Sequence, residues 1–458
     1  MRIMLDFPLG VREICAALRA QAPEEILTKE VRAVCTDTRE AIAADLFIAL
    51  DGENGSGEYY VNDAIAKGCI AVSARHSEKV IGVDNTSDAL FALAKLYKSK
   101  INIRHTVAIT GSVGKSTTVK FLSRILQIKY KVHSTAGNFN NHIGVPLTVL
   151  SAPKDTEILV IELGMNHKGE ISRLSKCVEP TIGIITAIGT AHIGNLGSRE
   201  EIARAKLEIK DGMTEGVLLL PKDEPLLSGV ENAKYVSHES SLSSFSFKRD
   251  TDVSFAHLSP YGDIYGIKFF DTRAHLLDDL ALSISASQII GMNGDEIISG
   301  VEAINESHLR QRFIVLNGYT VFDDSYNASL ESVVADLVYI KSLDRPTGAF
   351  LGDVLELGDM AKDIHEEIGK EAARIGIDRL YLYGEHAEDV AKGALAGGMD
   401  QGHIFINTDL ASPEISLRHI KENHLTDEVI LFKASHRLRL DKIADTLKNE
   451  EGINYDRY

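Results

Sequence analysis

Apolar residues recur along this chain in two alternating patterns. One is the short continuous apolar run, which is typical of a strand buried on both faces of a parallel sheet. Such runs occupy residues 106–109, 158–161, 182–187, 321–322, 349–351, 380–383 and 429–432. Between them, apolar residues recur at helical spacing, as in Val119, Leu122, Ile125 and Leu126. This alternation predicts an α/β protein with parallel sheets.

The pattern also divides the chain into three blocks. Residues 1–102 mix short strands, such as 45–50, with helices, such as 87–98. Strands and helices alternate regularly in residues 103–315, and the alternation begins again in residues 316–458. We therefore expect an N-terminal α/β domain, a central domain with a mononucleotide-binding parallel sheet, and a C-terminal domain with a Rossmann-like doubly wound sheet.

A glycine-rich turn, Thr110-Gly111-Ser112-Val113-Gly114-Lys115-Ser116-Thr117, links the first strand of the central block to a helix. Glycines let backbone N–H groups approach phosphate oxygens, and the helix N-terminus adds partial positive charge. Lys115 would reach the β- and γ-phosphates, and the Ser116 hydroxyl would hold Mg²⁺. Ile109 replaces the first glycine of the common motif, so the stretch could also be an ordinary strand-to-helix turn. The flanking strand and helix favour the interpretation that the loop binds a nucleoside triphosphate.

Composition and charge restrict the class of protein. The 458 residues are 44% hydrophobic and 25% charged, as in ordinary globular proteins. The formal net charge of −17 argues against nucleic acid or an anionic membrane as the main partner. We see no signal peptide and no membrane-spanning run, and the four scattered cysteines suggest neither disulfides nor zinc. We expect a cytoplasmic protein that acts on small molecules.

Polar residues follow two apolar runs of the central block. Glu162 ends one run and His192 follows the next, and ligands of open α/β sheets lie at the carboxyl ends of strands. An acid there, beside a phosphate loop, can hold Mg²⁺, although an exposed carboxylate or a structural histidine would give the same pattern. Lys206 lies in the helical stretch 200–210, where a lysine is ordinarily solvated.

Two further segments offer groups for recognition. The stretch 135–146 is rich in asparagine, and the amides of Asn138 and Asn141 could bind sugar hydroxyls or peptide carbonyls, unless the stretch is an ordinary turn. Asp323-Asp324-Ser325-Tyr326-Asn327 follows the first strand of the third block and could bind ribose or orient an incoming group. Arg312 lies just before it, where a guanidinium could clamp a phosphoryl group in transfer.

Taken in order, these motifs resemble those of the Mur ligase family. The shared features are the T-G-S-x-G-K-S loop, T-x-G-N-x-N-N-x-x-G-V-P, Glu162, His192, Lys206 and D-D-S-Y-N. The resemblance extends to Thr36-Asp37-Thr38-Arg39 in the first block and to the stretch 351–358 in the third. It implies a three-domain, ATP-dependent amide ligase of peptidoglycan synthesis, with one domain each for a UDP-sugar, for ATP and for an amine.

The resemblance also implies roles for single residues. Ser116 and Glu162 would hold one Mg²⁺, and His192 and a carbamylated Lys206 a second. Lys115, Lys206, His192 and Arg312 would serve the transfer of phosphate from ATP to the substrate carboxylate, before an amine captures the acyl phosphate. The nucleotide would further contact Asp279 and Asp324, and the other substrates would contact Thr38, Arg39, Asn138, Asn141, Tyr326, Asn327 and Lys433. The motifs are most similar to those of members that join D-alanyl-D-alanine to a UDP-linked muramoyl tripeptide, and we expect a monomer.

The chain departs from the family pattern at several places. Asp279 stands where an asparagine near adenine is expected, and Ser329-Leu330 replaces an N-P pair. Ala434 and His436 interrupt a lysine-glycine-serine-arginine motif, and Glu58 replaces the histidine of D-G-H. Two alternatives therefore stay open. One is a divergent ligase that joins another amino acid or peptide to a different nucleotide-linked carrier, and the other is a non-catalytic nucleotide-binding partner protein.

Overall fold

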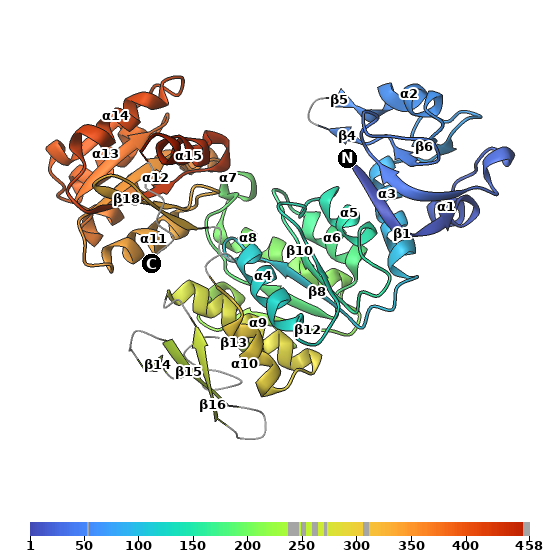
Figure 1. Cartoon of the computed structure of the whole chain (residues 1–458), viewed down its shortest axis with the longest axis horizontal. Helices are drawn as coiled ribbons and strands as arrows, with labels where there is room; N and C mark the ends of the chain where they lie inside the picture. The colour runs from blue at the N-terminus through green and yellow to red at the C-terminus, as the bar shows by residue number, and fades with distance from the viewer. Residues whose placement is uncertain are drawn as a thin grey trace.

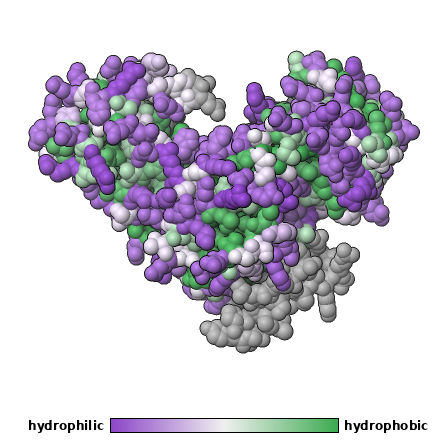
Figure 2. All heavy atoms as spheres, turned by 180° about the vertical axis from the view of Figure 1, so that it is seen from behind, coloured by the Kyte–Doolittle hydropathy of each residue, from purple (hydrophilic) through white to green (hydrophobic). Residues whose placement is uncertain are grey.

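Three sheets of five or six strands organise the chain. The computed structural model describes residues 1–52, 55–236, 247–248, 253–258, 264–269, 273–305 and 311–451. The sheets form three bodies arranged as a V, with the central domain at the vertex and the N-terminal and C-terminal domains as the arms (Figure 1). Seen from behind, the notch between the arms has largely hydrophilic walls (Figure 2).

The N-terminal sheet has the strand order β1-β2-β3-β6-β7, antiparallel between β1 and β2 and parallel elsewhere. Its strands are β1 (Arg2–Gly10), β2 (Glu30–Cys35), β3 (Leu46–Ile48), β6 (Ile70–Ser73) and β7 (Ile81–Gly82), beside a small ribbon of β4 (Asp51–Gly52) and β5 (Gly55–Ser56). Its helices are α1 (Val11–Leu18), α2 (Val61–Ala66) and α3 (Thr86–Lys98). The buried Tyr97 of α3 donates a hydrogen bond to the carbonyl of Ala152 at 2.8 Å, which ties this domain to the central one.

The central sheet is parallel throughout, in the order β13-β12-β11-β8-β10-β9. Its strands are β8 (His105–Thr110), β9 (Val132–Ser134), β10 (Ile158–Glu162), β11 (Ile182–Ile185), β12 (Val217–Pro221) and β13 (Ala233–Val236). Its helices are α4 (Lys115–Leu126), α5 (Gly144–Leu150), α6 (Glu170–Val178), α7 (Ile193–Leu196), α8 (Arg199–Leu207), α9 (Ala274–Ile290) and α10 (Gly294–Glu302). Strand order reverses direction at β8, and such a switch point is where open α/β sheets bind ligands.

Three antiparallel strands extend from this domain at the bottom of Figure 1. They are β14 (Phe247–Lys248), β15 (Val253–Leu258) and β16 (Ile264–Phe269).

The C-terminal sheet has the order β17-β18-β22-β19-β20-β21, and only the β17–β18 pair is antiparallel. Its strands are β17 (Arg312–Val315), β18 (Tyr319–Asp323), β19 (Thr347–Gly352), β20 (Arg379–Tyr383), β21 (Ile404–Asn407) and β22 (Glu428–Lys433). Its helices are α11 (Leu330–Lys341), α12 (Ala361–Ile375), α13 (Ala387–Ala396), α14 (Pro413–Asn423) and α15 (Leu440–Glu451). Because β17 pairs with β18, this sheet begins a few residues before the domain limit expected at 315–316.

The apolar runs of the central and C-terminal blocks are buried strands, which confirms the α/β class. The run 182–187 is a strand only as far as Ile185, and the run 45–50 only over Leu46–Ile48. The helical stretch 200–210 is α8 followed by a 3₁₀ turn, η3 (Glu208–Gly212). Among the described residues, no helix combines the length and apolar character needed to cross a membrane.

Candidate active site

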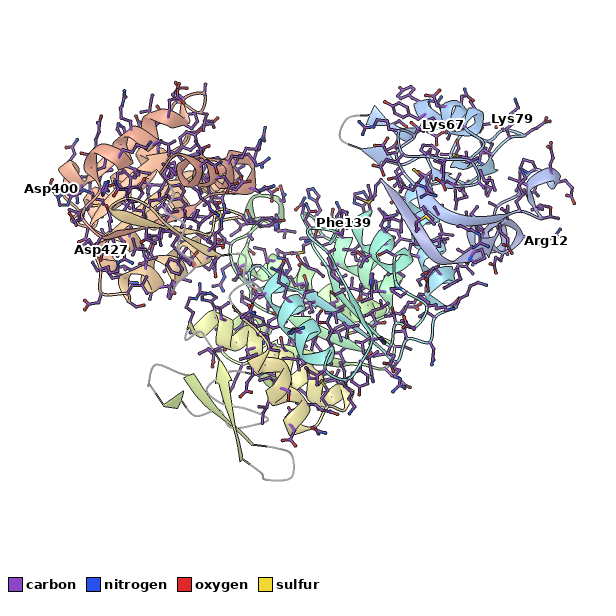
Figure 3. The ribbon with its side chains drawn as sticks, in the orientation of Figure 1. Arg12, Lys67, Lys79, Phe139, Asp400 and Asp427 are labelled. Carbon is purple, nitrogen blue, oxygen red and sulfur yellow. The ribbon has the colours of Figure 1, made fainter. Side chains whose placement is uncertain are left out.

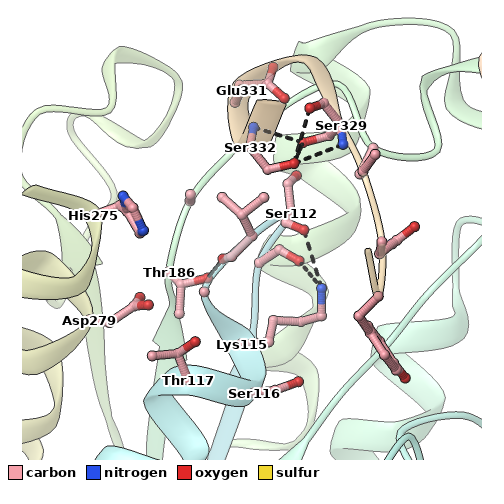
Figure 4. A pocket seen from close by; sticks show the side chains of 18 of the residues that line it. Ser112, Lys115, Ser116, Thr117, Thr186, His275, Asp279, Ser329, Glu331 and Ser332 are labelled. Atoms are coloured by element: carbon pink, nitrogen blue, oxygen red, sulfur yellow. Dashed lines mark hydrogen bonds between the residues drawn. The ribbon is translucent and has the colours of Figure 1, made fainter. Parts of the chain in front are cut away.

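A pocket opens between the phosphate-loop end of the central domain and the C-terminal domain. Residues 111–117, Glu162, His192 and Lys206 line it from the central domain. Asp324, Tyr326, Asn327, Glu331 and Lys433 line it from the C-terminal domain. Figure 4 shows the first turn of α11, with Ser329, Glu331 and Ser332, beside the phosphate loop, and His275 and Asp279 of α9 across from it. The structure thus brings predicted nucleotide, metal and substrate residues to one place.

The phosphate loop needs its glycines for two physical reasons. Gly111 has φ +155° and Gly114 has φ +85°, which L side chains rarely adopt. A Cβ on Gly111 would also lie 1.9 Å from Oγ1 of Thr186. Lys115 caps its own loop, since its Nζ donates to the carbonyl of Gly111 at 2.8 Å. This lysine lies where it can exchange a backbone carbonyl for a phosphate oxygen.

Glu162, the last residue of β10, is almost fully buried beside the start of α4. Its carboxylate accepts one hydrogen bond from the Ser116 hydroxyl at 2.6 Å and one from the amide nitrogen of Asn140 at 2.7 Å. A hydroxyl and a carboxylate in direct contact are a suitable oxygen donor pair for Mg²⁺. These residues fit the magnesium ion that we expect at the loop.

Lys206, on α8, is a buried lysine, with 2% of its surface exposed. Burial, together with the nearby positive charge of Lys115, holds the pKa of Lys206 well below its usual value. A lower pKa favours the neutral amine, which is the form that can react with carbon dioxide to give an anionic carbamate. The position therefore fits the expected carbamate, whose oxygens could serve a second ion.

His192 precedes α7 and contacts the C-terminal domain. Its Nδ1 forms a short hydrogen bond with Oε2 of Glu356. Although His192 lines the same pocket as Lys206, no group of three or more His, Cys, Asp or Glu side chains in the described ranges is arranged to hold a metal by itself. A second ion would thus depend on Lys206 supplying a further oxygen donor.

Asp279 lies against the phosphate loop from α9. Its Oδ1 accepts a hydrogen bond from the Thr118 hydroxyl at 3.1 Å, and its Oδ2 is buried and has no hydrogen-bond partner within the described part of the chain. Burial raises the pKa of the Asp279 carboxyl well above its usual range. The residue lines the pocket, as expected for a nucleotide contact, and its burial favours the neutral form of the carboxyl group.

On the C-terminal wall, Lys433 at the end of β22 lies between the partly buried Asp324 and the buried Asp336. Its Nζ contacts Oδ2 of Asp324 closely and Oδ2 of Asp336 at 2.8 Å. Burial and the neighbouring Asp324 raise the pKa of Asp336 to about 8, although Lys433 opposes the shift. Because its charge is already balanced by Asp324 and Asp336, Lys433 chiefly links β18, α11 and β22. Beside it, the Tyr326 ring stacks on His436 with 5.1 Å between ring centroids.

Other predicted residues lie away from this pocket. Arg312 does not line it, because its guanidinium donates to Asp323 and to Asp445, each at 2.7 Å. Thr38 and Arg39 lie in the N-terminal domain, where Arg39 is 88% exposed and pairs with Asp37. A phosphoryl clamp by Arg312 would require it to leave its two carboxylates, so that role stays a prediction.

The asparagine-rich stretch divides into residues with different surroundings. Asn141 holds the turn before α5, since its Oδ1 accepts hydrogen bonds from the backbone N–H groups of Ile143 at 3.1 Å and Gly144 at 2.8 Å. Asn138 is exposed on the loop whose Phe139 points toward the notch between the arms (Figure 3). Neither lines the pocket, whereas Asn140 does.

Comparison with known proteins agrees with this geometry. The model of the Mur ligase middle domain matches residues 109–285, and that of the Mur ligase glutamate ligase domain matches residues 310–436. A UDP-N-acetylmuramoyl-tripeptide–D-alanyl-D-alanine ligase of Bacillus subtilis is 36% identical over 91% of this chain and 93% of its own length. The chain belongs to the Mur ligase family.

Solved Mur ligases share its architecture. A MurF crystal structure from Acinetobacter baumannii superposes with a TM-score of 0.87 at 26% identity, covering 98% of this chain and all of that chain (100%). MurF from Thermotoga maritima in complex with ADP has the same fold, with a TM-score of 0.79 at 24% identity over 91% of this chain and 97% of that one.

Several pocket residues of this Mur ligase were missed by reasoning from the sequence. They are Asn140, His275, Gln311, Glu331 and Glu356, of which the first four line the pocket and the last holds His192. Asn140 stood in a recognised motif, but the motif alone does not distinguish it from Asn138 and Asn141. Glu356 stood in the recognised stretch 351–358, but neither it nor Glu331 carries a local signal of its contact with the central domain.

Proposed function

We propose that the protein is an ATP-dependent, ADP-forming ligase that joins D-alanyl-D-alanine to UDP-N-acetylmuramoyl tripeptide in peptidoglycan precursor synthesis. The observation that carries the proposal is the shared pocket, in which the phosphate loop of one domain faces Asp324, Tyr326 and Asn327 of another. A ligase of this kind must hold a nucleotide and an amine on opposite sides of a carboxylate.

The first half-reaction transfers the γ-phosphoryl group. An oxygen of the tripeptide carboxylate attacks the γ-phosphorus, the bond to the bridging oxygen breaks, and ADP leaves with that electron pair. Lys115 releases the loop carbonyl of Gly111 and binds phosphate oxygens, while N–H groups of the loop and of α4 hold the rest. Positive charge and backbone donors stabilise the negative charge that builds up in the transition state.

Magnesium would be held by the Ser116 hydroxyl and the Glu162 carboxylate, and by His192 and the Lys206 carbamate for a second ion. When bound, it neutralises phosphate charge and fixes phosphate geometry. Asn140 would keep one oxygen of Glu162 oriented through its amide, because it donates to Oε1 while Ser116 contacts Oε2.

The second half-reaction captures the acyl phosphate. The amine of the dipeptide, once it has lost a proton, attacks the acyl carbon, and phosphate leaves with the electrons of the C–O bond. Tyr326 and Asn327, which line the pocket from the C-terminal domain, would contact the dipeptide. Closure of the two domains around the pocket would exclude water, which would otherwise hydrolyse the intermediate.

The test is a reconstituted reaction with ATP, Mg²⁺, UDP-N-acetylmuramoyl tripeptide and D-alanyl-D-alanine. We expect one phosphate released per product, and a product mass equal to the two substrates joined with loss of water. Omission of either the tripeptide or the dipeptide should abolish phosphate release. Turnover only with another amine or carrier would instead establish a divergent ligase, and no turnover with any would favour a non-catalytic role.

The proposal extends to a monomer in the cytoplasm. The formal net charge of −17 supports the monomer, because a net charge far from zero keeps proteins soluble and monomeric. Light scattering after gel filtration measures the mass directly, and a mass of twice 50.1 kDa would reject the monomer.

A further inference from the structure

The loop of residues 186–197 in the central domain contacts two separate segments of the C-terminal domain. On one side, the Thr190 hydroxyl donates to Oε2 of Glu331 at 3.1 Å. On the other, His192 pairs with the Glu356 carboxylate, and the N–H of Gly194 donates to the carbonyl of Glu356 at 3.0 Å. Figure 1 shows α7, which follows His192, lying beside the C-terminal domain. The loop therefore carries both a pocket residue and the junction between two domains.

The junction depends on close backbone contact. A Cβ on Gly194 would lie 2.4 Å from the nitrogen of Gly358 and 2.6 Å from the carbonyl carbon of Leu357. Both atoms belong to the backbone at the start of the 3₁₀ turn η6 (Gly358–Met360), so they cannot rotate away as a side chain can. The two domains can approach this closely only because residue 194 has no side chain.

Both partners of the histidine–carboxylate contact have unusual backbone geometry. His192 has φ +64° and Glu356 has φ +63°, a left-handed conformation uncommon for residues other than glycine. Such conformations cost roughly 1 kcal/mol or more each, and they persist where surrounding structure holds them, often at functional sites. Here the geometry at both residues aims the two side chains at one another across the junction.

A hydrogen bond at one ring nitrogen determines what the other can do. With Nδ1 engaged by a carboxylate, the ring orientation is fixed and Nε2 is left as the nitrogen that can act in the pocket. That carboxylate comes from the C-terminal domain, whereas Ser116, Glu162 and Lys206 all belong to the central domain.

We propose that Glu356 is a positioning residue, which orients His192 for its role in the pocket only when the C-terminal domain is docked through the Gly194–Gly358 contact. The active site of the central domain is then complete only in the docked arrangement. This inference rests on the proposed function for the role of His192, but the docking itself involves no substrate.

The docking is tested in the full chain by energy transfer between dyes. Cysteines in place of Ile128 and Leu395, both 44% exposed, place one dye on each domain. The four native cysteines are buried and should not react. In the absence of substrates, Gly194→Ala should lower transfer efficiency, because its Cβ meets backbone. Asn195→Ala in the same loop is the control, because it shortens an exposed side chain and adds no atom at the junction. Equal efficiency in Gly194→Ala and wild type would overturn the docking contact.

The positioning is tested at Glu356. Glu356→Ala should weaken Mn²⁺ binding, measured by electron paramagnetic resonance with ADP present, by about 10- to 100-fold and lower kcat similarly, with the KM for ATP little changed. Glu356→Gln keeps an acceptor oxygen and should restore most of both. Unchanged Mn²⁺ affinity in Glu356→Ala would overturn the positioning role. If the wild-type protein had no ligase activity, the proposed function would fail while the energy-transfer and Mn²⁺ measurements still decided this inference.

Discussion

Replacement of Gly114 by alanine tests the account of the phosphate loop, because the chain contains a closely matched control. Gly114 and Gly169 each precede a helix, with φ +85°, ψ −16° and φ +85°, ψ −15° respectively. A Cβ on Gly169 would meet nothing within 4 Å, whereas a Cβ on Gly114 would lie 2.4 Å from Oδ1 and 2.8 Å from Oδ2 of Asp279. The two substitutions share the backbone cost and differ in the steric cost.

The magnitudes follow from these contacts. An alanine in the left-handed conformation costs about 1–2 kcal/mol, so Gly169→Ala should lose that much free energy of unfolding. Gly114→Ala should lose about 1–3 kcal/mol more, which is the usual cost of overpacking a tight site. Displacement of the loop should also weaken ADP binding in Gly114→Ala, while Gly169→Ala should bind ADP as wild type does.

The assay is urea unfolding followed by circular dichroism, with ADP affinity from calorimetry. Asp279→Ala, made alone and with Gly114→Ala, completes a double-mutant cycle that subtracts the lost hydrogen bond to Thr118. In the double variant, removal of the Asp279 side chain should restore most of the additional unfolding free energy that Gly114→Ala loses. Equal destabilisation by the two glycine substitutions, or a coupling energy below about 0.5 kcal/mol, would refute the steric argument.

Three further predictions concern buried charge. Burial raises the pKa of Asp279 well above 3.8, so above pH 3.8 the folded protein holds a proton that the unfolded chain releases. The free energy of unfolding therefore falls as pH rises from 3.8 toward the raised pKa. The Tm of Asp279→Asn should therefore rise relative to that of wild type as pH increases above 3.8, and a constant difference would contradict the prediction. Lys206→Ala should lower kcat about 10- to 100-fold, with partial rescue by acetate, and unchanged activity would reject the carbamate. Lys433→Met leaves Asp324 and Asp336 without their buried cation and should cost about 3–5 kcal/mol of unfolding free energy. Adding Asp336→Leu should recover part of the lost unfolding free energy. A Lys433→Met variant as stable as wild type at pH 7 would contradict the stabilising role of the Lys433 ion pairs.

Much of the fold was readable because its signals are local. A strand buried on both faces and a helix packed on one side each impose their own spacing on apolar residues. The phosphate loop is likewise contiguous, so its strand, glycines, lysine and helix could be recognised together. Glu162 and His192 could be placed near it because the carboxyl ends of parallel strands meet at one edge of a sheet.

Arg312 shows what local reasoning does not reveal. Its closeness in the chain to D-D-S-Y-N suggested a role at the pocket, but the antiparallel register places it opposite Asp323. Its charge is then taken up by Asp323 and Asp445, the latter on α15. Register and distant helices are not visible in the spacing of residues around position 312.

The α/β class, the phosphate loop and the residue types expected at the metal site could be read from the order of residues, because each depends on neighbours in the chain. Which groups meet across the pocket depends instead on the folded chain. Glu356 reaches His192 over 164 residues, Asp279 reaches Thr118 over 161, and Lys433 reaches Asp324 over 109. Such contacts are set by how the domains and sheets pack, since a side chain buried far from water must find its charge or hydrogen-bond partner wherever the fold brings one.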